Sequence, residues 1–168
     1  MPTSLSTYLT SDHDRIDNFL QQALTDSGDI NPDAYNGFRQ GLLRHIGIEE
    51  KILIPALQPL LNERMKQILA QIKADHSLIV ALLVPSPTKG IIAALNTILE
   101  KHNWLEEANG GFYEFSERFN EQMLSELAEK IRTAPEVKSL PNNPDPKVLA
   151  ATRRALERAG YNPDEYLQ

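Results

Sequence analysis

Hydrophobic residues recur every three to four positions along most of the chain, which is the period of an amphipathic α-helix. No segment shows the alternation of a half-buried strand. Asn31-Pro32 and Ser86-Pro87 each resemble an N-cap followed by a proline in the first turn. Pro55 should kink or end the second helix, and Gly110-Gly111 should interrupt the fourth. We therefore expect four long helices. The first begins near residue 4 or at 10–11, and the others begin near residues 32, 60 and 87. Residues 112–131 either continue the fourth helix or form a helix of their own.

Four long helices with short connections favour an all-α, up-down antiparallel four-helix bundle over residues 1–133. Residues 134–146 contain four prolines and are typical of a linker. Asp145-Pro146 then opens a short helix that Gly160 closes. The predicted fold is thus a bundle followed by a Pro-rich linker and a C-terminal helical extension (134–168). We expect this extension to pack on its own bundle or on a second copy in a homodimer, with a different protein partner as the alternative.

Composition narrows the classes of function. The 168 residues suit one domain, and the absence of cysteine excludes disulfides, thiolate metal sites and cysteine nucleophiles. Seventeen basic residues stand against 23 acidic ones, a net charge of −6 that argues against nucleic acid or an anionic membrane as a partner. The N-terminus does not resemble a secretory signal, and the longest apolar stretch, 78–84, is far short of the roughly 20 residues of a membrane span. We expect a cytoplasmic protein.

The four histidines all lie within apolar stripes of the expected helices. Each is three, four or seven residues from apolar neighbours, so all four imidazoles should point inward: His13, His45, His76 and His102. Glu49 and Glu106, four residues after a histidine, share this placement. A buried ionised carboxylate costs several kcal/mol unless it is paired or bound to a metal, and no lysine or arginine lies at these inward positions. The pattern therefore requires a cation between the helices.

The chain repeats this arrangement. Asp12-His13 precedes His45-x-x-x-Glu49-Glu50, and Asp75-His76 precedes His102-x-x-x-Glu106-Glu107. Two helix pairs would thus supply four imidazoles and two carboxylates, a set that suits two iron or manganese ions, with zinc or copper as competitors. We interpret Glu50 and Glu107 as facing solvent or supporting the site. The two aspartates either orient a histidine through its second nitrogen or lie at the surface.

These motifs, with Pro55 after the first glutamate pair, resemble the hemerythrin-like, histidine-histidine-glutamate cation-binding family over residues 5–130. The resemblance implies an up-down four-helix bundle that holds a non-heme di-iron centre. It makes the four histidines terminal ligands, and it makes Glu49 and Glu106 bridging carboxylates, together with an oxo or hydroxo bridge. Glu107 is a rival for Glu106, because some family members place the second acid five residues after the histidine.

Two departures from the family pattern bear on function. Oxygen-carrying hemerythrins place two histidines one turn apart on the third helix, but here Ile72 and Val80 flank His76. One iron should then have fewer protein ligands, which argues against simple reversible oxygen carriage. The second departure, Asn109-Gly110-Gly111, either opens a path to the metals or accommodates a turn. Trp104 and Tyr113 are expected in the core, with a ligand route as the alternative.

The leading hypothesis is a di-iron protein that binds or senses a small diatomic molecule, O2 or NO, or that takes part in iron handling or the stress response. Members linked to nitric oxide, oxidative stress, iron sensing or iron-centre repair have the more similar ligand set. One alternative is a helical interaction module with a structural metal. Another is a di-iron enzyme that activates peroxide or oxidises ferrous iron.

Overall fold

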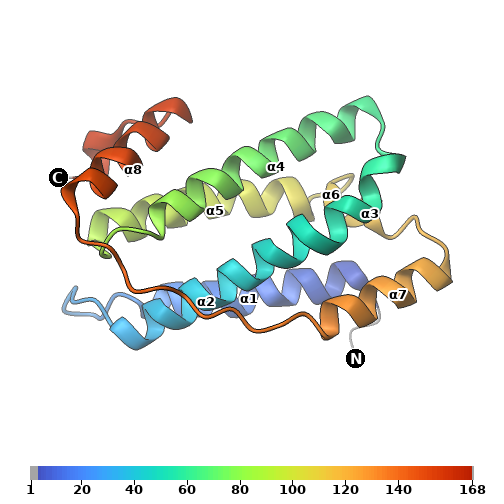
Figure 1. Cartoon of the computed structure of the whole chain (residues 1–168), viewed down its shortest axis with the longest axis horizontal. Coiled ribbons are helices and arrows are strands. Elements are labelled where there is room, and N and C mark those ends of the chain that lie inside the picture. The colour runs from blue at the N-terminus through green and yellow to red at the C-terminus, as the bar shows by residue number, and fades with distance from the viewer. Residues whose placement is uncertain (1–3, 168) are drawn as a thin grey trace.

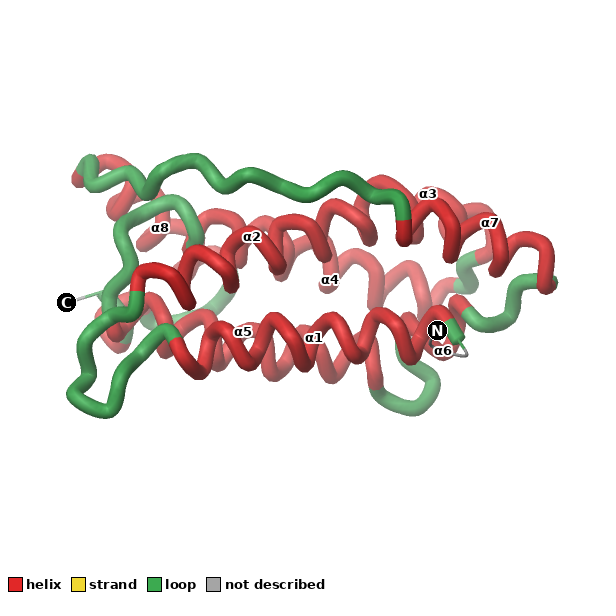
Figure 2. Tube along the Cα trace, turned by 90° about the horizontal axis from the view of Figure 1, so that it is seen from below, coloured by secondary structure: helices red, strands yellow, loops and turns green. Residues whose placement is uncertain are grey.

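The computed structural model describes residues 4–167, and the regular elements of this range are all helical. Its four long helices are α1 (Leu5–Gln22), α2 (Pro32–Ile48), α4 (Glu63–Leu82) and α5 (Lys89–Glu107). They lie side by side along the long axis of the molecule (Figures 1 and 2). Within the described residues, strand-like pairing is limited to two isolated bridges, Leu24 with Ile30 and Pro85 with Asn143. The all-α prediction is confirmed.

Side-chain caps fix where the long helices begin. Ser4 caps α1, so the earliest of the expected starts is the correct one, and Asn31 caps α2 through its side-chain oxygen. The expected start of α5 at Ser86-Pro87 is wrong. Thr88 is the cap, because its hydroxyl accepts from the Ile91 amide at 3.1 Å, and the helix begins at Lys89.

The chain does not stop being helical at Pro55. After α2 it forms a π-helical turn, η1 (Glu49–Leu53), and then α3 (Ile54–Leu57) and a 3₁₀ turn, η2 (Gln58–Leu60). In η1 the Ile54 amide donates to the carbonyl of Glu49, five residues earlier. Proline has no amide hydrogen and crowds the preceding turn, and the wider turn just before Pro55 accommodates both. Such turns are frequent at functional sites, and this one begins at a predicted ligand.

Two separate helices follow α5. Gly110 adopts a left-handed conformation (φ +76°), which a residue without a Cβ adopts at little cost, and the chain reverses into α6 (Phe112–Ser116). After a further turn comes α7 (Glu121–Arg132), whose Leu127 and Ile131 are buried. Residues 112–131 therefore form helices of their own rather than continuing α5.

The C-terminal extension packs on its own chain. From α7 a non-helical segment runs along α2, as the long loop in Figure 2 shows, and the Arg44 guanidinium donates to the Ala134 carbonyl at 3.2 Å. Asp145 caps the predicted helix α8 (Pro146–Arg158), and a 3₁₀ turn, η3 (Pro163–Glu165), follows it. On α8 the Thr152 hydroxyl donates to the Ala81 carbonyl of α4, and Leu156 is fully buried.

The buried apolar side chains form two clusters. Representative members of the first are Ile16, Leu42, Ile79 and Leu95, and representative members of the second are Leu9, Ile48, Ile72 and Phe112. On each long helix the predicted histidine lies between residues of the first cluster and residues that belong to, or pack against, the second cluster, and Glu49 and Glu106 follow a histidine by four residues. The histidines and glutamates therefore form a polar layer inside an otherwise apolar interior.

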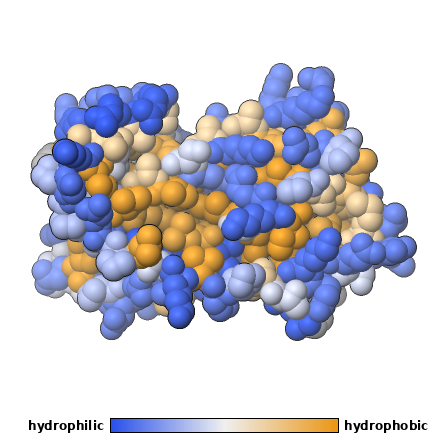
Figure 3. Space-filling model, viewed as in Figure 1, coloured by the Kyte–Doolittle hydropathy of each residue, from blue (hydrophilic) through white to orange (hydrophobic). Residues whose placement is uncertain are grey.

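The surface is mixed rather than uniformly polar. Figure 3 shows apolar side chains gathered over the middle of one face, with hydrophilic side chains over much of the rest. The most exposed large apolar residues are Leu140 and Trp104. Among the described residues, no helix combines the length and apolarity that crossing a membrane requires.

Candidate metal centre

All six predicted ligands lie in the buried polar layer, and none is more than 6% exposed. They form two groups of four, and in each group one potential ligand atom per residue lies within 4.8 Å of the others. Both groups contain Glu49 and Glu106. One adds His13 of α1 and His45 of α2, here called the His13/His45 half, and the other adds His76 of α4 and His102 of α5, the His76/His102 half.

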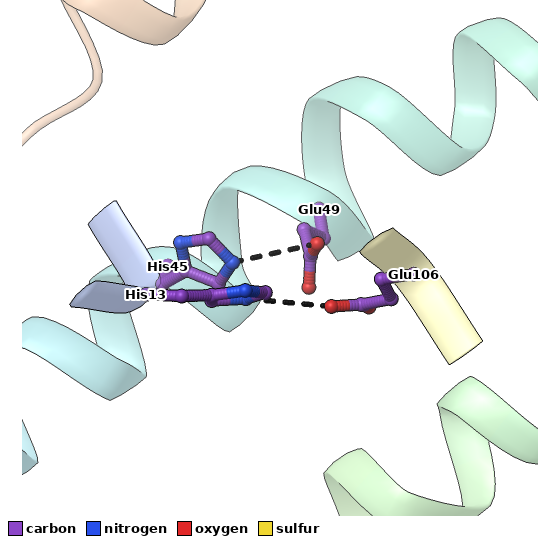
Figure 4. Close-up of side chains that lie close together, drawn as sticks. All are labelled: His13, His45, Glu49 and Glu106. Atoms are coloured by element: carbon purple, nitrogen blue, oxygen red, sulfur yellow. Dashed lines mark ion pairs between the residues drawn. The ribbon is translucent and has the colours of Figure 1, made fainter. Parts of the chain in front are cut away.

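Each shared glutamate turns one oxygen toward each half. Glu49 places Oε1 3.5 Å from His45 Nε2 and Oε2 3.1 Å from His76 Nε2. Glu106 places Oε2 3.4 Å from His13 Nε2 and Oε1 3.3 Å from His102 Nε2. Figure 4 shows the His13/His45 half, where both imidazoles point at the carboxylates. Two carboxylates placed in this way could bridge two cations.

The outer nitrogens of the histidines face a second ring of carboxylates. His45 Nδ1 donates to Asp12 at 2.9 Å, and His76 Nδ1 donates to Glu50 at 2.8 Å. His13 Nδ1 donates to Glu107, and His102 Nδ1 lies 3.5 Å from Asp75. In a neutral imidazole, a proton held on Nδ1 leaves the lone pair on Nε2, which is the inward atom here. In His13, His45 and His76 the outer acid thus leaves the inward Nε2 as the nitrogen with the free lone pair.

This outer ring answers questions that the sequence left open. Glu106 is fully buried in the layer, whereas the Glu107 side chain is 32% exposed and contacts a histidine from outside. Asp12 and Asp75 do contact histidines, but on the next helix rather than the adjacent residue. Glu50 likewise supports a histidine of another helix.

The electrostatic interactions within the layer favour positive charge. Burial acts to lower the pKa of His45, but the carboxylates of Glu49 and Asp12 outweigh it and raise that pKa to about 9. Burial acts to raise the pKa of Glu49, yet the neighbouring histidines hold it well below its usual value. Burial and the charge of Glu49 together raise the pKa of Glu106. Protons therefore supply part of the positive charge when no cation is bound.

The hydrogen bonding of the layer fits a metal. Four buried atoms of the layer lack a hydrogen-bond partner among the described residues: Glu49 Oε2, Glu106 Oε1, His76 Nε2 and the outward-facing His102 Nδ1. The first three point inward, and Glu49 Oε2 lies 3.1 Å from His76 Nε2 without the alignment of a hydrogen bond. A buried polar atom without a partner costs about 1–3 kcal/mol, so three together are unusual in a protein core. All three are metal-ligating atom types, and all three face the His76/His102 half.

Comparison with protein families agrees with this chemistry. A family model described as the hemerythrin HHE cation binding domain matches residues 4–132. The chain belongs to this hemerythrin family. No curated protein and no solved structure matches the chain. A hemerythrin domain with two buried histidine–glutamate clusters has a metal-binding site, which implies a metal cofactor.

This hemerythrin domain also contains a site residue that sequence reasoning missed. Tyr113 of α6 is fully buried, and its hydroxyl lies among the four residues of the His13/His45 half. The expectation that Tyr113 lies in the core is confirmed, but its position shortly after Gly110-Gly111 does not determine the direction of its hydroxyl, so its place in the site was not predicted. The expectation that Trp104 is a core residue is wrong, because its side chain is 68% exposed.

The positions around His76 provide no additional ligand in this hemerythrin domain. Ile72, one turn earlier, is fully buried in the second apolar cluster, and Val80, one turn later, is 38% exposed. Asn109-Gly110-Gly111 forms the turn between α5 and α6, which favours the interpretation that these residues accommodate a turn. The two halves thus have matching histidine pairs and different surroundings.

Proposed function

We propose that this hemerythrin-family protein holds two iron ions, one in each half, with Glu49 and Glu106 as bridging carboxylates. The observation that carries this proposal is the orientation of the glutamates, each with one oxygen toward each histidine pair. In this proposal α1, α2 with its continuation, α4 and α5 act as an up-down antiparallel four-helix bundle around the ions.

Iron is the metal that this donor set favours. Imidazole nitrogens and carboxylate oxygens without thiolates suit iron, whereas manganese and zinc are alternatives that metal analysis can identify. Such a pair, once bound, supplies a redox-active centre that can bind O2 or NO. The outer acids hold the histidine Nδ1 protons, and the apolar clusters on both sides exclude bulk water from the layer.

The physiological ligand in this proposal is a small diatomic molecule, O2 or NO. None of the six ligands exceeds 6% exposure, so a large substrate has no direct contact with them. The His76/His102 half supplies two imidazoles and shared carboxylates, which leaves coordination positions for an external ligand. We propose a role in sensing, detoxification or iron handling on this basis.

Metal analysis and ligand titration test this function. Protein produced with supplemental iron should contain close to two irons per chain. The absorption spectrum of the reduced protein should change when either NO or O2 is added. Glu100→Ala, which alters an exposed acid on α5, serves as the control and should behave like the wild type. If the absorption spectrum of the iron-loaded protein does not change with either gas, the metal is structural and the proposed ligand-binding function is wrong.

A further inference from the structure

The hydroxyl of Tyr113 lies close to all four residues of the His13/His45 half. It lies 2.6 Å from Glu49 Oε1 and 3.0 Å from Glu106 Oε2. It also lies 3.1 Å from both His13 Nε2 and His45 Nε2. One oxygen atom is therefore within hydrogen-bond distance of all four donor atoms that this half directs inward.

Hydrogen bonding by the phenol alone does not account for these contacts. A phenol has one hydrogen, so it can donate to only one of its four neighbours at a time. The other three contacts require protons on the neighbouring glutamate or histidines, and an imidazole that already donates through Nδ1 must be protonated on both nitrogens to donate to the phenol as well. A cation would satisfy the same lone pairs at once. The phenol oxygen would then be a further oxygen donor to it.

The fold holds this side chain in place from both sides. Gly111, at the start of α6, is so close to the end of α5 that a Cβ would lie 2.7 to 2.9 Å from three carbonyl oxygens. The Glu114 carboxylate accepts from the Gly110 amide at 2.6 Å and thereby stabilises the turn. Phe112 and Phe115, beside Tyr113 in sequence, are buried in the second apolar cluster. These contacts fix the position of α6, and the Tyr113 ring is itself fully buried in the same cluster.

We propose that Tyr113 is a protein ligand of the cation in the His13/His45 half, bound through its phenol oxygen. This inference rests on the proposed function, because it assumes a metal ion between His13 and His45. As the metal–oxygen bond forms, the phenol O–H bond breaks and its proton passes to solvent, with no change of oxidation state. Tyrosine oxygen is an established protein ligand of iron.

This ligand makes the two metal positions unequal. The His13/His45 half gains a fifth protein donor, whereas the His76/His102 half keeps two imidazoles and the shared carboxylates. The external diatomic ligand therefore binds at the His76/His102 half. Ile72, one turn before His76, is not a histidine and adds no further protein ligand to the His76/His102 half, which also favours binding of the external ligand there.

Optical and vibrational spectra of the full-length, iron-loaded protein test the assignment. A phenolate bound to ferric iron gives a charge-transfer band in the visible region, and Tyr113→Phe should abolish that band while close to two irons per chain remain. Tyr35→Phe removes the hydroxyl of another buried tyrosine, in the first apolar cluster, and should leave the band unchanged. Resonance Raman spectra of the wild type, excited in the band, should show tyrosine modes that shift when ring-deuterated tyrosine is incorporated.

The outcomes separate this inference from the function beneath it. A wild-type protein with two irons and no tyrosine modes, or a Tyr113→Phe variant that keeps the band, overturns the Tyr113 assignment and leaves the metal pair intact. A wild-type protein that takes up no metal overturns both. The wild-type Raman spectrum needs no variant, so poor folding of Tyr113→Phe would not remove the test.

Discussion

In the His13/His45 half the inward nitrogens meet a tyrosine hydroxyl, whereas in the His76/His102 half they meet only the shared glutamates among the contacts described. The donor sets are otherwise alike: two imidazoles, two shared carboxylates, and an outer acid beside each histidine. The ring centroids within each pair are also similarly spaced, at 4.4 and 4.9 Å. The difference comes from one short helix, α6, which inserts Tyr113 into one half.

The comparison shows how a repeated pattern can give two unequal sites. Each half takes its two histidines from two long helices, so the periodicity of the helices alone gives both halves the same histidine and glutamate ligands. Three inward-facing atoms without a hydrogen-bond partner, Glu49 Oε2, Glu106 Oε1 and His76 Nε2, all face the half without the tyrosine. The half that lacks the phenol is therefore the one whose hydrogen bonding most requires something further.

Removing a shared glutamate should have the largest effect, because it affects both halves at once. Glu49→Ala takes one oxygen from His45 and one from His76, and we expect the iron content to fall from about two ions per chain to one or none. Elemental analysis of purified protein measures this, with Glu100→Ala as the matched control. An unchanged iron content in Glu49→Ala would remove that residue from the ligand set.

Single histidine variants should separate the halves. His76→Ala should abolish the spectral response to NO and keep the visible band assigned to Tyr113, because that band belongs to the other half. His13→Ala should weaken the visible band and should retain more of the spectral response to NO than His76→Ala does. Absorption spectra of the two variants before and after addition of NO provide the measurement. Equal losses of band and response in both variants would contradict the division into unequal halves.

The outer acids should have the smallest effect, and the effect should differ between the halves. Loss of an acid that orients a metal-bound histidine typically costs 10- to 100-fold in metal affinity. Asp12→Asn should approach this range, because Asp12 accepts from His45 at 2.9 Å, whereas Asp75→Asn should cost less, since Asp75 lies 3.5 Å from His102. Competition with a chelator measures both affinities.

The exposed neighbour Asp14 provides the control for this series, and Asp14→Asn should retain the wild-type affinity. A larger loss of metal affinity in Asp75→Asn than in Asp12→Asn would show that the acid–histidine distances do not predict how much each acid contributes to metal binding.

Helix periodicity could predict the polar layer because its members lie on long, regular helices. The inward direction of His13 or Glu106 follows from its spacing to apolar residues on the same helix, and the structure buries both. Asn31-Pro32 and Asp145-Pro146 marked helix starts correctly, because caps act through residues close in sequence. The all-helical class and the gathering of the six residues were therefore accessible from the chain alone.

The rest depends on contacts between elements. Tyr113 follows a glycine turn, so no helical register connects it to the histidines, and only the fold directs its hydroxyl into the layer. The partners of Asp12 and Glu50 lie on other helices, which sequence spacing does not specify. The π turn at Glu49 is also invisible to periodicity, although Pro55 signalled some irregularity there.

A carboxylate-bridged pair of metal ions is tested by anomalous diffraction at the iron edge from crystals of the iron-loaded protein. We expect two anomalous peaks, one beside His13 and His45 and one beside His76 and His102, both in contact with Glu49 and Glu106. A single peak, or peaks outside this layer, would contradict it.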